Sequence, residues 1–598
     1  MKKLPTTWDL SPFGRRYNDP TFAKERASIE KKTRAFAKTW KNDQSYLTKP
    51  TSLKKALDQY EALARIPSNE AMYLFFARMG DSTNKDYAAA EKRYDDWSEK
   101  LSDHTRFFGL SLGTIKEKDQ KIFLKSSQLK PYRHFLRGIF ETAQFQLSEK
   151  EEKILSMKSG VSSGNWASMV SEIFSQESAE VLVEEKGRVK KATKPFNEYI
   201  QFIHSSNKRV RDAAATALEA TFKRHRLVLE KEFNSILEDK KINDELRGFK
   251  RPDHARILSD DVGFDVVDTM TGVVSKRFKV ARDYYALKAR LLGQEKLHYH
   301  ERNVPVGNVD TEYSYEKSVE LVDQALSSVD PDFAQIHRDT VENGRVDVYP
   351  RTGKRGSAFC MYDEVTKPPY IMLNHTDRAR DVLTLGHEMG HAIHGTLIKG
   401  ENALNYDTPM FTAEIASTFC EGYTFDRILA QATGEERFIL LMQKIGEDVS
   451  TISRQVAAYN FECEVHDTFR KEGYLSADQI GAIFKKHMAS YMGPAVIQDY
   501  GAEDWWMYWS HFRSPFYVYS YASGLLLANG MRAIIRKDPE RWPKVKKFFY
   551  VGTSQSPKDT FDAIGIDLTD AAFWEGGVKE VEMMLKEAAK LAKELGKI

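Results

Sequence analysis

The chain has 598 residues, of which 41% are hydrophobic and 29% are charged, and its formal net charge at pH 7 is +3. This composition is ordinary for a globular protein of several domains or one large one, and the small net charge gives no reason to expect a nucleic-acid partner. No stretch approaches the run of about 18 apolar residues that crosses a membrane, so we expect no membrane partner either.

The N-terminus and the cysteines favour a cytoplasmic protein. Pro5 and Asp9 stand where a signal peptide would have an apolar run, so we expect no signal peptide. The three cysteines, Cys360, Cys420 and Cys463, are too few and too scattered for a disulfide framework. A reducing cytoplasm is therefore the expected compartment.

The first part of the chain, residues 1–193, has the pattern of helix after helix. We expect it to form an N-terminal helical region that makes part of a channel wall. Ser148 with Glu151 three residues later is a capping box that starts a helix. Residues 157–166 are rich in Gly and Ser and predict a break, and residues 181–191 alternate like a short hairpin with Gly187 at its turn.

The remainder, residues 194–598, is expected to form the catalytic domain. Residues 209–242 and 263–292 each have the pattern of a long helix, so the whole chain predicts a mainly α fold. His298 and His300 belong to no ligand pattern, and we expect each to be a surface or structural histidine.

A small β region interrupts the helices. Residues 346–350, 357–362 and 370–374 read as short strands that stand just before the most informative stretch of the sequence. Such a sheet can offer its edge to an extended peptide, and Gly356, Ser357 and Ala358 are small enough for a substrate backbone to approach. The alternative is a ribbon with a structural role only.

Residues 381–395, DVLTLGHEMGHAIHG, contain an H-E-x-x-H pattern in His387, Glu388 and His391. Two histidines four apart on a helix share one face, about 6 Å apart along the axis, so both imidazoles can reach one metal ion. Zinc suits neutral imidazole, and a catalytic zinc takes a third protein ligand and leaves a position for water, whose proton Glu388 can accept. The alternative is a helix with two hydrogen-bonded core histidines, but its apolar flanks would bury these polar groups at a cost without a metal.

The third ligand must come from further along the chain. Glu414 lies in an otherwise apolar helical segment, where a buried carboxylate needs a positive partner such as a metal ion. Glu421 shares its helix face and suits a contact to a histidine ligand. Burial therefore favours Glu414 as the ligand. His394 is about two turns from His387, too far to share the ion, and is expected in the core or behind a ligand.

A second stretch with chemical potential is HFRSPFYVYSYASG, residues 511–524. Hydrolysis through a tetrahedral intermediate builds negative charge on the former carbonyl oxygen, and a phenol or imidazole that donates a hydrogen bond to this oxyanion lowers the barrier. His511, Tyr517, Tyr519 and Tyr521 are the candidates. Taken alone, the stretch is better explained as the tyrosine-rich start of a packed helix.

HEMGHAIH, followed by FTAEIASTFCEGY and HFRSPFYVYSYASG, resembles oligoendopeptidase F of the thimet-oligopeptidase-like zinc metallopeptidases. The resemblance extends from Trp8 to the C-terminus and is weakest in the N-terminal helical region. It implies a mostly helical, bowl- or clam-shaped enzyme with a zinc ion deep in a channel, beside the small β-ribbon. The expected activity is the hydrolysis of internal bonds in short oligopeptides, with folded proteins excluded.

The resemblance also implies residue roles. One Zn²⁺ per chain would be held by His387, His391 and Glu414, with Glu388 as the general base, in agreement with the spacing argument.

For the oxyanion, the resemblance makes Tyr521 the first choice of donor and His511 a contact to the substrate or the intermediate. The spacing between His511 and the nearer tyrosine departs from the thimet-oligopeptidase pattern. Either Tyr517 or Tyr519 therefore fills the role of a second tyrosine that binds substrate.

Two other functions are consistent with the same residues. One is a zinc carboxypeptidase or peptidyl-dipeptidase, and the other is a non-enzymatic helical binding protein that zinc stabilises. Glu388 argues against the second, because a structural zinc site closes its fourth position and needs no base. The sequence predicts neither the oligomeric state nor the subsite preference, and it does not distinguish Zn from Co or Mn.

Overall fold

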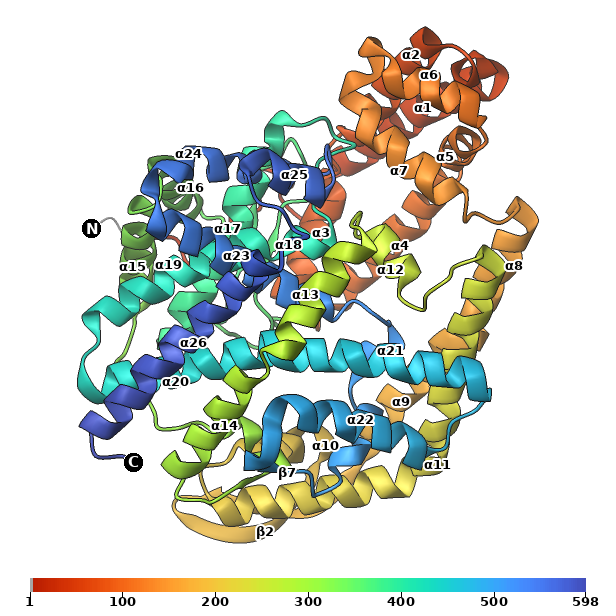
Figure 1. The fold of residues 1–598 in the computed structure, drawn as a ribbon. Helices are drawn as coiled ribbons and strands as arrows, with labels where there is room; N and C mark the ends of the chain where they lie inside the picture. The colour runs from red at the N-terminus through yellow and green to blue at the C-terminus, as the bar shows by residue number, and fades with distance from the viewer. Residues whose placement is uncertain (1–3) are drawn as a thin grey trace. The chain divides into compact units, whose positions relative to one another are not determined.

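A computed structural model describes residues 4–598, and residues 1–3 lie outside it (Figure 1). Helices follow one another along nearly the whole chain, and the few strands form three small sheets. The predicted mainly α fold is confirmed.

The helices pack into two units, and each unit draws on three separate segments of the chain. The first unit contains residues 4–144, 310–431 and 534–566, and the second contains residues 145–309, 432–533 and 567–598. The boundary predicted near residue 193 falls inside the second unit, so the packing divides the chain differently. That boundary remains a prediction about which part carries catalysis.

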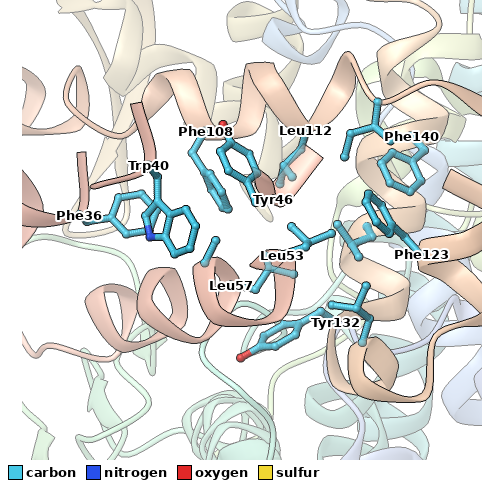
Figure 2. Close-up of a cluster of buried hydrophobic side chains, with 14 residues drawn as sticks. Phe36, Trp40, Tyr46, Leu53, Leu57, Phe108, Leu112, Phe123, Tyr132 and Phe140 are labelled. Atoms are coloured by element: carbon cyan, nitrogen blue, oxygen red, sulfur yellow. The ribbon is translucent and has the colours of Figure 1, made fainter. Parts of the chain in front are cut away.

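The first unit begins with a helical layer that surrounds one hydrophobic cluster. The helices of the whole first unit are α1 (Pro20–Asn42), α2 (Pro50–Ala64), α3 (Asn69–Gly80), α4 (Lys85–Ser102), α5 (Arg106–Gly113), α6 (Glu117–Lys125), α7 (Arg133–Ala143), α15 (Tyr315–Ser327), α16 (Pro331–Glu342), α17 (Ala379–Leu397), α18 (Met410–Ala413), α19 (Ile415–Gln431), α24 (Trp542–Val545) and α25 (Pro557–Ile564). Figure 2 shows the cluster, in which Trp40 and Phe108 are fully buried among leucines from α2 and α5. Each such side chain contributes about 1.5–3 kcal/mol through burial, which holds these N-terminal helices together.

A three-stranded sheet lies in the first unit beside α17. Its strands β4 (Val346–Asp347), β6 (Tyr370–Met372) and β5 (Phe359–Met361) stand in the order β4-β6-β5. β4 is parallel to β6 and β5 is antiparallel to it, so β5 is an edge strand, and it contacts α17. The predicted strand region beside the H-E-x-x-H helix is confirmed. Trp8 donates from Nε1 to the carbonyl of Ile371 at 2.8 Å and ties the N-terminal segment to this sheet.

The second unit is organised around α11, a helix of 40 residues. Its helices are α8 (Glu149–Ser159), α9 (Asn165–Gln176), α10 (Phe196–Tyr199), α11 (Lys208–Arg247), α12 (His254–Ser259), α13 (Phe264–Lys276), α14 (Lys279–Leu291), α20 (Gly434–Val449), α21 (Gln455–Glu472), α22 (Ala477–Met492), α26 (Ala571–Glu594) and α23 (Tyr519–Lys537), which begins in this unit. Its strands are β1 (Ser178–Glu185), β2 (Arg188–Pro195), β3 (Leu297–His298) and β7 (Val496–Ile497).

Two local predictions in this unit are confirmed. Ser148 and Glu151 form the capping box at the start of α8. β1 and β2 form an antiparallel hairpin whose two turn residues, Lys186 and Gly187, both have positive φ. That backbone twist is the one that two-residue hairpin turns prefer.

The predicted break at residues 157–166 is wrong. A five-residue π-helical turn, Gly160–Gly164, joins α8 directly to α9. Both glycines take the right-handed helical conformation, with φ of −58° and −59°, so neither ends the helix. Glycine disfavours a helix only by roughly 1 kcal/mol per residue, which packing of the flanking helices can outweigh.

Two further structural findings bear on the sequence expectations. Within residues 4–598, no helix has the length and apolar character to cross a bilayer. The three cysteines are free thiols.

Candidate metal centre

The H-E-x-x-H residues lie in the middle of α17, in the first unit. His387 and His391 are one turn apart, and their ring centroids are 5.2 Å apart. Glu388 is largely buried, with 7% of its surface exposed, between the two histidines in sequence. Packing of the apolar residues of α17 thus holds Glu388 in a buried position and the two histidines in half-buried positions.

Two glycines of α17 allow α19 to approach closely. A Cβ on Gly390 would lie 2.3 Å from the carbonyl oxygen of Ala416, and one on Gly386 would lie 2.4 Å from Oγ1 of Thr424. Real Cβ atoms essentially never come so near another atom. The small residues in the motif therefore bring α19, and Glu414 just before it, against the two histidines.

The three predicted ligands converge. Oε2 of Glu414 lies 3.2 Å from Nε2 of His387 and 3.5 Å from Nε2 of His391. One donor atom from each residue lies within 4.8 Å of the others. Two imidazole nitrogens and one carboxylate oxygen are the donor set of a catalytic zinc site with one position left open, so these residues fit a divalent metal.

The electrostatics favour a cation at this point. Burial alone would raise the pKa of Glu414, but hydrogen bonds from His387 and His391 outweigh burial and hold the pKa well below its usual range. Burial would likewise lower the pKa of His387, yet Glu414 and Glu421 outweigh it and raise the pKa well above its usual value. The protein thus stabilises positive charge where the donors meet, and a metal ion would replace the proton there.

Two more side chains contact the candidate ligands. Glu421 on α19 lies 3.0 Å from Nδ1 of His387, which leaves Nε2 to face the other donors. The hydroxyl of Ser417 donates to Oε2 of Glu414 at 2.9 Å. Such partners fix the tautomer and direction of a ligand. His394 is fully enclosed against Val551 and Phe548, so it belongs to the core.

Glu388 has the environment of a proton acceptor. Burial raises its pKa above the usual carboxyl value, and the two neighbouring histidines oppose this rise only in part. A general base works best when its pKa is near the working pH. Burial therefore favours the protonated form of this carboxyl more than water does.

A cavity of about 640 Å³ opens beside these donors, within the range of small-molecule and peptide sites. Besides His387, Glu388, His391 and Glu414, it is lined by Ala358, Phe359, Cys360, Tyr362, Asp363, Tyr406 and Asp407. Of the three small residues predicted to admit substrate, Ala358 lines the cavity, whereas Gly356 and Ser357 are exposed next to it in sequence.

Sequence reasoning missed several lining residues. Cys360 lies in β5, Ala358 precedes this strand and Tyr362 follows it, so the alternation of an extended chain from Ala358 would have suggested Cys360 and Tyr362; Phe359 and Asp363 also line the cavity and do not follow that alternation. Tyr406 and Asp407 stand in the loop before Glu414 and carry no local signal of this role.

His511, Tyr517 and Tyr521 form a ring cluster in the second unit. Nδ1 of His511 is hydrogen-bonded to the hydroxyl of Tyr517, and the ring centroid of Tyr521 lies 5.9 Å from both other rings. Burial lowers the pKa of His511, and the charge of Arg454 lowers it further. Burial, together with Tyr521, raises the pKa of Tyr517 to about 12, so its phenol keeps its proton.

Tyr519 does not join this cluster. It is fully buried, and its hydroxyl donates to Oδ2 of Asp260 at 2.6 Å. Burial raises its pKa well above the usual value. This geometry favours Tyr517 over Tyr519 as the second tyrosine near Tyr521.

Among residues 4–598, one other group of potential metal donors lies in the second unit, formed by Asp212, His300 and Glu301. Lys208 and Arg211 already pair with its carboxylates, Lys208 with both and Arg211 with Glu301 at 2.7 Å. These two cations take the place that a metal ion would need. His300 is buried and lies 2.9 Å from Asp212, which agrees with a structural role.

Comparison with known protein families decides the classification. The model of peptidase family M3 matches residues 201–580, more than half of the chain, and the model described as oligopeptidase F matches residues 112–176. The chain belongs to peptidase family M3. The M3 enzymes are metallopeptidases, so the predictions of the family and of a metalloendopeptidase are confirmed.

This M3 peptidase resembles several bacterial proteins along nearly its whole length. It is 27% identical over 594 residues to an oligoendopeptidase F homolog of Borreliella burgdorferi, with 98% of each chain covered. It is 25% identical to oligopeptidase PepF of Bacillus subtilis, with 80% of this chain and 72% of that one covered. A solved structure from Chlamydophila abortus covers 98% of each chain with a TM-score of 0.85 and 21% identity. The solved structure of oligoendopeptidase-F from Enterococcus faecium shares the fold, with a TM-score of 0.68 and 20% identity. The match covers 96% of this chain and 99% of that one.

The close approach of α17 and α19 in the M3 peptidase can be tested by Gly390→Ala. Because the new Cβ meets backbone atoms of Ala416 and Ser417, we expect the free energy of unfolding to fall by about 1–3 kcal/mol. The displaced helices should also weaken metal retention. Urea unfolding and metal content of the purified variant measure the two effects.

The matched control is Gly138→Ala in α7 of the same unit, where a Cβ meets nothing within 4 Å. It should raise the free energy of unfolding by about 0.5–1 kcal/mol, because alanine favours a helix over glycine. Equal stability of the two variants would contradict the packing argument.

Proposed function

We propose that the M3 peptidase is a zinc-dependent endopeptidase that hydrolyses internal bonds of short oligopeptides. The observation that carries the proposal is the convergence of His387, His391 and Glu414 within 4.8 Å beside a cavity that also holds Glu388. The names of the relatives support the same activity, since two of them are called oligoendopeptidase F or its homolog.

The metal site takes one zinc ion per chain. Nε2 of His387, Nε2 of His391 and a carboxylate oxygen of Glu414 would hold it. When bound, zinc supplies a Lewis acid that polarises the scissile carbonyl and makes water a stronger nucleophile at neutral pH. Glu421 keeps His387 in the tautomer that presents Nε2.

Glu388 moves the proton. Its carboxylate accepts a proton from the attacking water and then donates it to the nitrogen of the departing amine. The buried position of Glu388 at the cavity, next in sequence to His387, supports this role.

Tyr521 donates a hydrogen bond to the oxyanion that forms from the scissile carbonyl. His511 contacts the substrate or the intermediate, and Tyr517 binds substrate next to Tyr521. The shared ring cluster of these three residues supports this assignment, as does the separate hydrogen bond of Tyr519 to Asp260.

The peptide is bound in extended form along the edge of β5. Gly356, Ser357 and Ala358 let the substrate backbone come close, and main-chain hydrogen bonds hold it regardless of its side chains. Residues 1–193 contribute to the wall of the substrate channel. The enzyme acts in the cytoplasm, and it needs neither a nucleic-acid nor a membrane partner.

The decisive experiment uses an internally quenched oligopeptide blocked at both ends, which only an endopeptidase can cleave. We expect cleavage by the purified enzyme, loss of cleavage after treatment with a chelator, and recovery on addition of zinc. Fluorescence of the peptide and metal analysis of the enzyme give the two readings.

Two outcomes would contradict the proposal. Cleavage that persists after all metal is removed would exclude the metal-dependent reaction. No cleavage with one zinc bound per chain would instead favour a carboxypeptidase, a peptidyl-dipeptidase or a binding protein, which peptides with free ends would separate.

A further inference from the structure

The segment that carries His511, Tyr517 and Tyr521 contains a strained residue. Phe516 has a φ of +71°, in the left-handed region that bulky residues rarely adopt. Its side chain is fully buried and packs on the ring of His466 at 4.8 Å. Such a conformation costs of order 1–3 kcal/mol and persists only where surrounding groups hold it.

Glu462 on α21 is the group that holds the backbone there. One oxygen of its carboxyl accepts a hydrogen bond from the backbone N–H of Phe516 at 2.8 Å. The side chain is 1% exposed, and its Oε2 has no hydrogen-bond partner among residues 4–598. Burial raises the pKa of Glu462 to about 8, so at neutral pH the group is mostly an uncharged acid.

Burying a carboxyl without an ion pair costs free energy, so packing alone does not explain a glutamate at this position. An apolar residue of similar size would fill the same space without the cost of burying a polar group. Within residues 4–598, the hydrogen bond of the carboxyl that an apolar residue could not replace is the one from the amide of Phe516. This contact joins α21 to the residue directly before Tyr517.

Two other carboxylates fix the same segment on either side. Arg513 forms a bidentate pair with Glu232 of α11, at 2.7 and 2.9 Å. Tyr519 donates to Asp260. Between these two contacts, the buried carboxyl of Glu462 accepts a hydrogen bond from the main chain at Phe516, the residue with a positive φ.

We propose that Glu462 is a positioning residue of the peptidase reaction, which holds the amide of Phe516 in its left-handed conformation and so aligns Tyr517 with His511 and Tyr521. This proposal rests on the proposed function, because it requires that these three side chains act on the substrate. Glu462 itself touches no reacting atom; it acts through the main chain.

The test compares three substitutions that differ in the acceptor they offer. Glu462→Gln keeps an oxygen in the same place and resembles the uncharged acid, so kcat should stay within about threefold of the unchanged enzyme. Glu462→Leu fills the space without an acceptor, and Glu462→Asp withdraws the acceptor by one methylene. Both should lower kcat about 10- to 100-fold, because a misplacement of about 1 Å in a reacting group has an effect of this size.

The readouts separate positioning from simple destabilisation. KM for the blocked quenched peptide should change less than kcat, and zinc content should remain near one per chain, in all folded variants. Thermal unfolding identifies any variant that is not folded at the assay temperature. If Glu462→Leu fails to fold, Glu462→Asp carries the test.

Tyr521→Phe, measured in parallel, distinguishes failure of the Glu462 proposal from failure of the roles proposed for His511, Tyr517 and Tyr521. If Tyr521→Phe is slow while folded Glu462→Leu and Glu462→Asp have the kcat of the unchanged enzyme, Glu462 has only a structural role and the proposal falls. The same holds if Glu462→Gln is as slow as Glu462→Leu. If Tyr521→Phe itself keeps the full rate, the assigned role of the whole ring cluster falls, and the inference about Glu462 with it.

Discussion

Glu388→Gln is expected to keep the fold and the metal of the M3 peptidase and to lose nearly all turnover. The amide has the size and shape of the carboxyl but accepts no proton from the attacking water. Removal of a general base typically lowers kcat by about 10²–10⁴-fold. Metal analysis, thermal unfolding and kcat with the blocked quenched peptide are the three measurements.

A matched control for this variant is Glu342→Gln, the same chemical change at an exposed position at the end of α16, outside the cavity. It should leave kcat and metal content unaltered. Wild-type turnover in Glu388→Gln, with metal bound, would show that another group accepts the proton.

Glu414→Ala should deprive the enzyme of its metal. Loss of a residue that only orients a ligand typically weakens metal affinity by about 10- to 100-fold, so loss of a ligand should weaken it more than about 100-fold. We therefore expect purified Glu414→Ala to hold far less than one zinc per chain and to show little cleavage. Zinc content after dialysis against a competing chelator measures the effect.

Glu421→Ala is the comparison, because Glu421 lies on the same helix and contacts His387 through its other nitrogen. Its zinc affinity should fall by only about 10- to 100-fold. If Glu414→Ala retained full zinc and Glu421→Ala lost it, the third ligand would be Glu421.

Local sequence patterns predicted the helical part of the metal site in detail. The i, i+4 spacing of His387 and His391 is a property of one helix, and the structure has that helix with both rings on one side. The capping box of Ser148 and the hairpin turn at Gly187 are confirmed for the same reason. Each depends on residues within one turn of helix or one hairpin.

Composition gave a wrong prediction for one segment, because helix packing there outweighs the low helix propensity of its residues. The Gly- and Ser-rich residues 157–166 look like a break, yet Gly160 and Gly164 are helical. The sequence also left Tyr517 and Tyr519 equivalent, since the two tyrosines are two residues apart in the same segment. Only the contact of Tyr519 with Asp260, a residue far away in the chain, separates them.

The sequence by itself determined that two histidines share one helix face, with a glutamate beside them, in the pattern of a metallopeptidase, because helix periodicity is a local property. The tertiary structure decided which carboxylate meets them, since Glu414 reaches the histidines only because Gly386 and Gly390 let α19 approach α17. It also decided that Glu462 holds Phe516, a contact between segments 54 residues apart. Such contacts depend on how distant helices pack, and no local pattern encodes that packing.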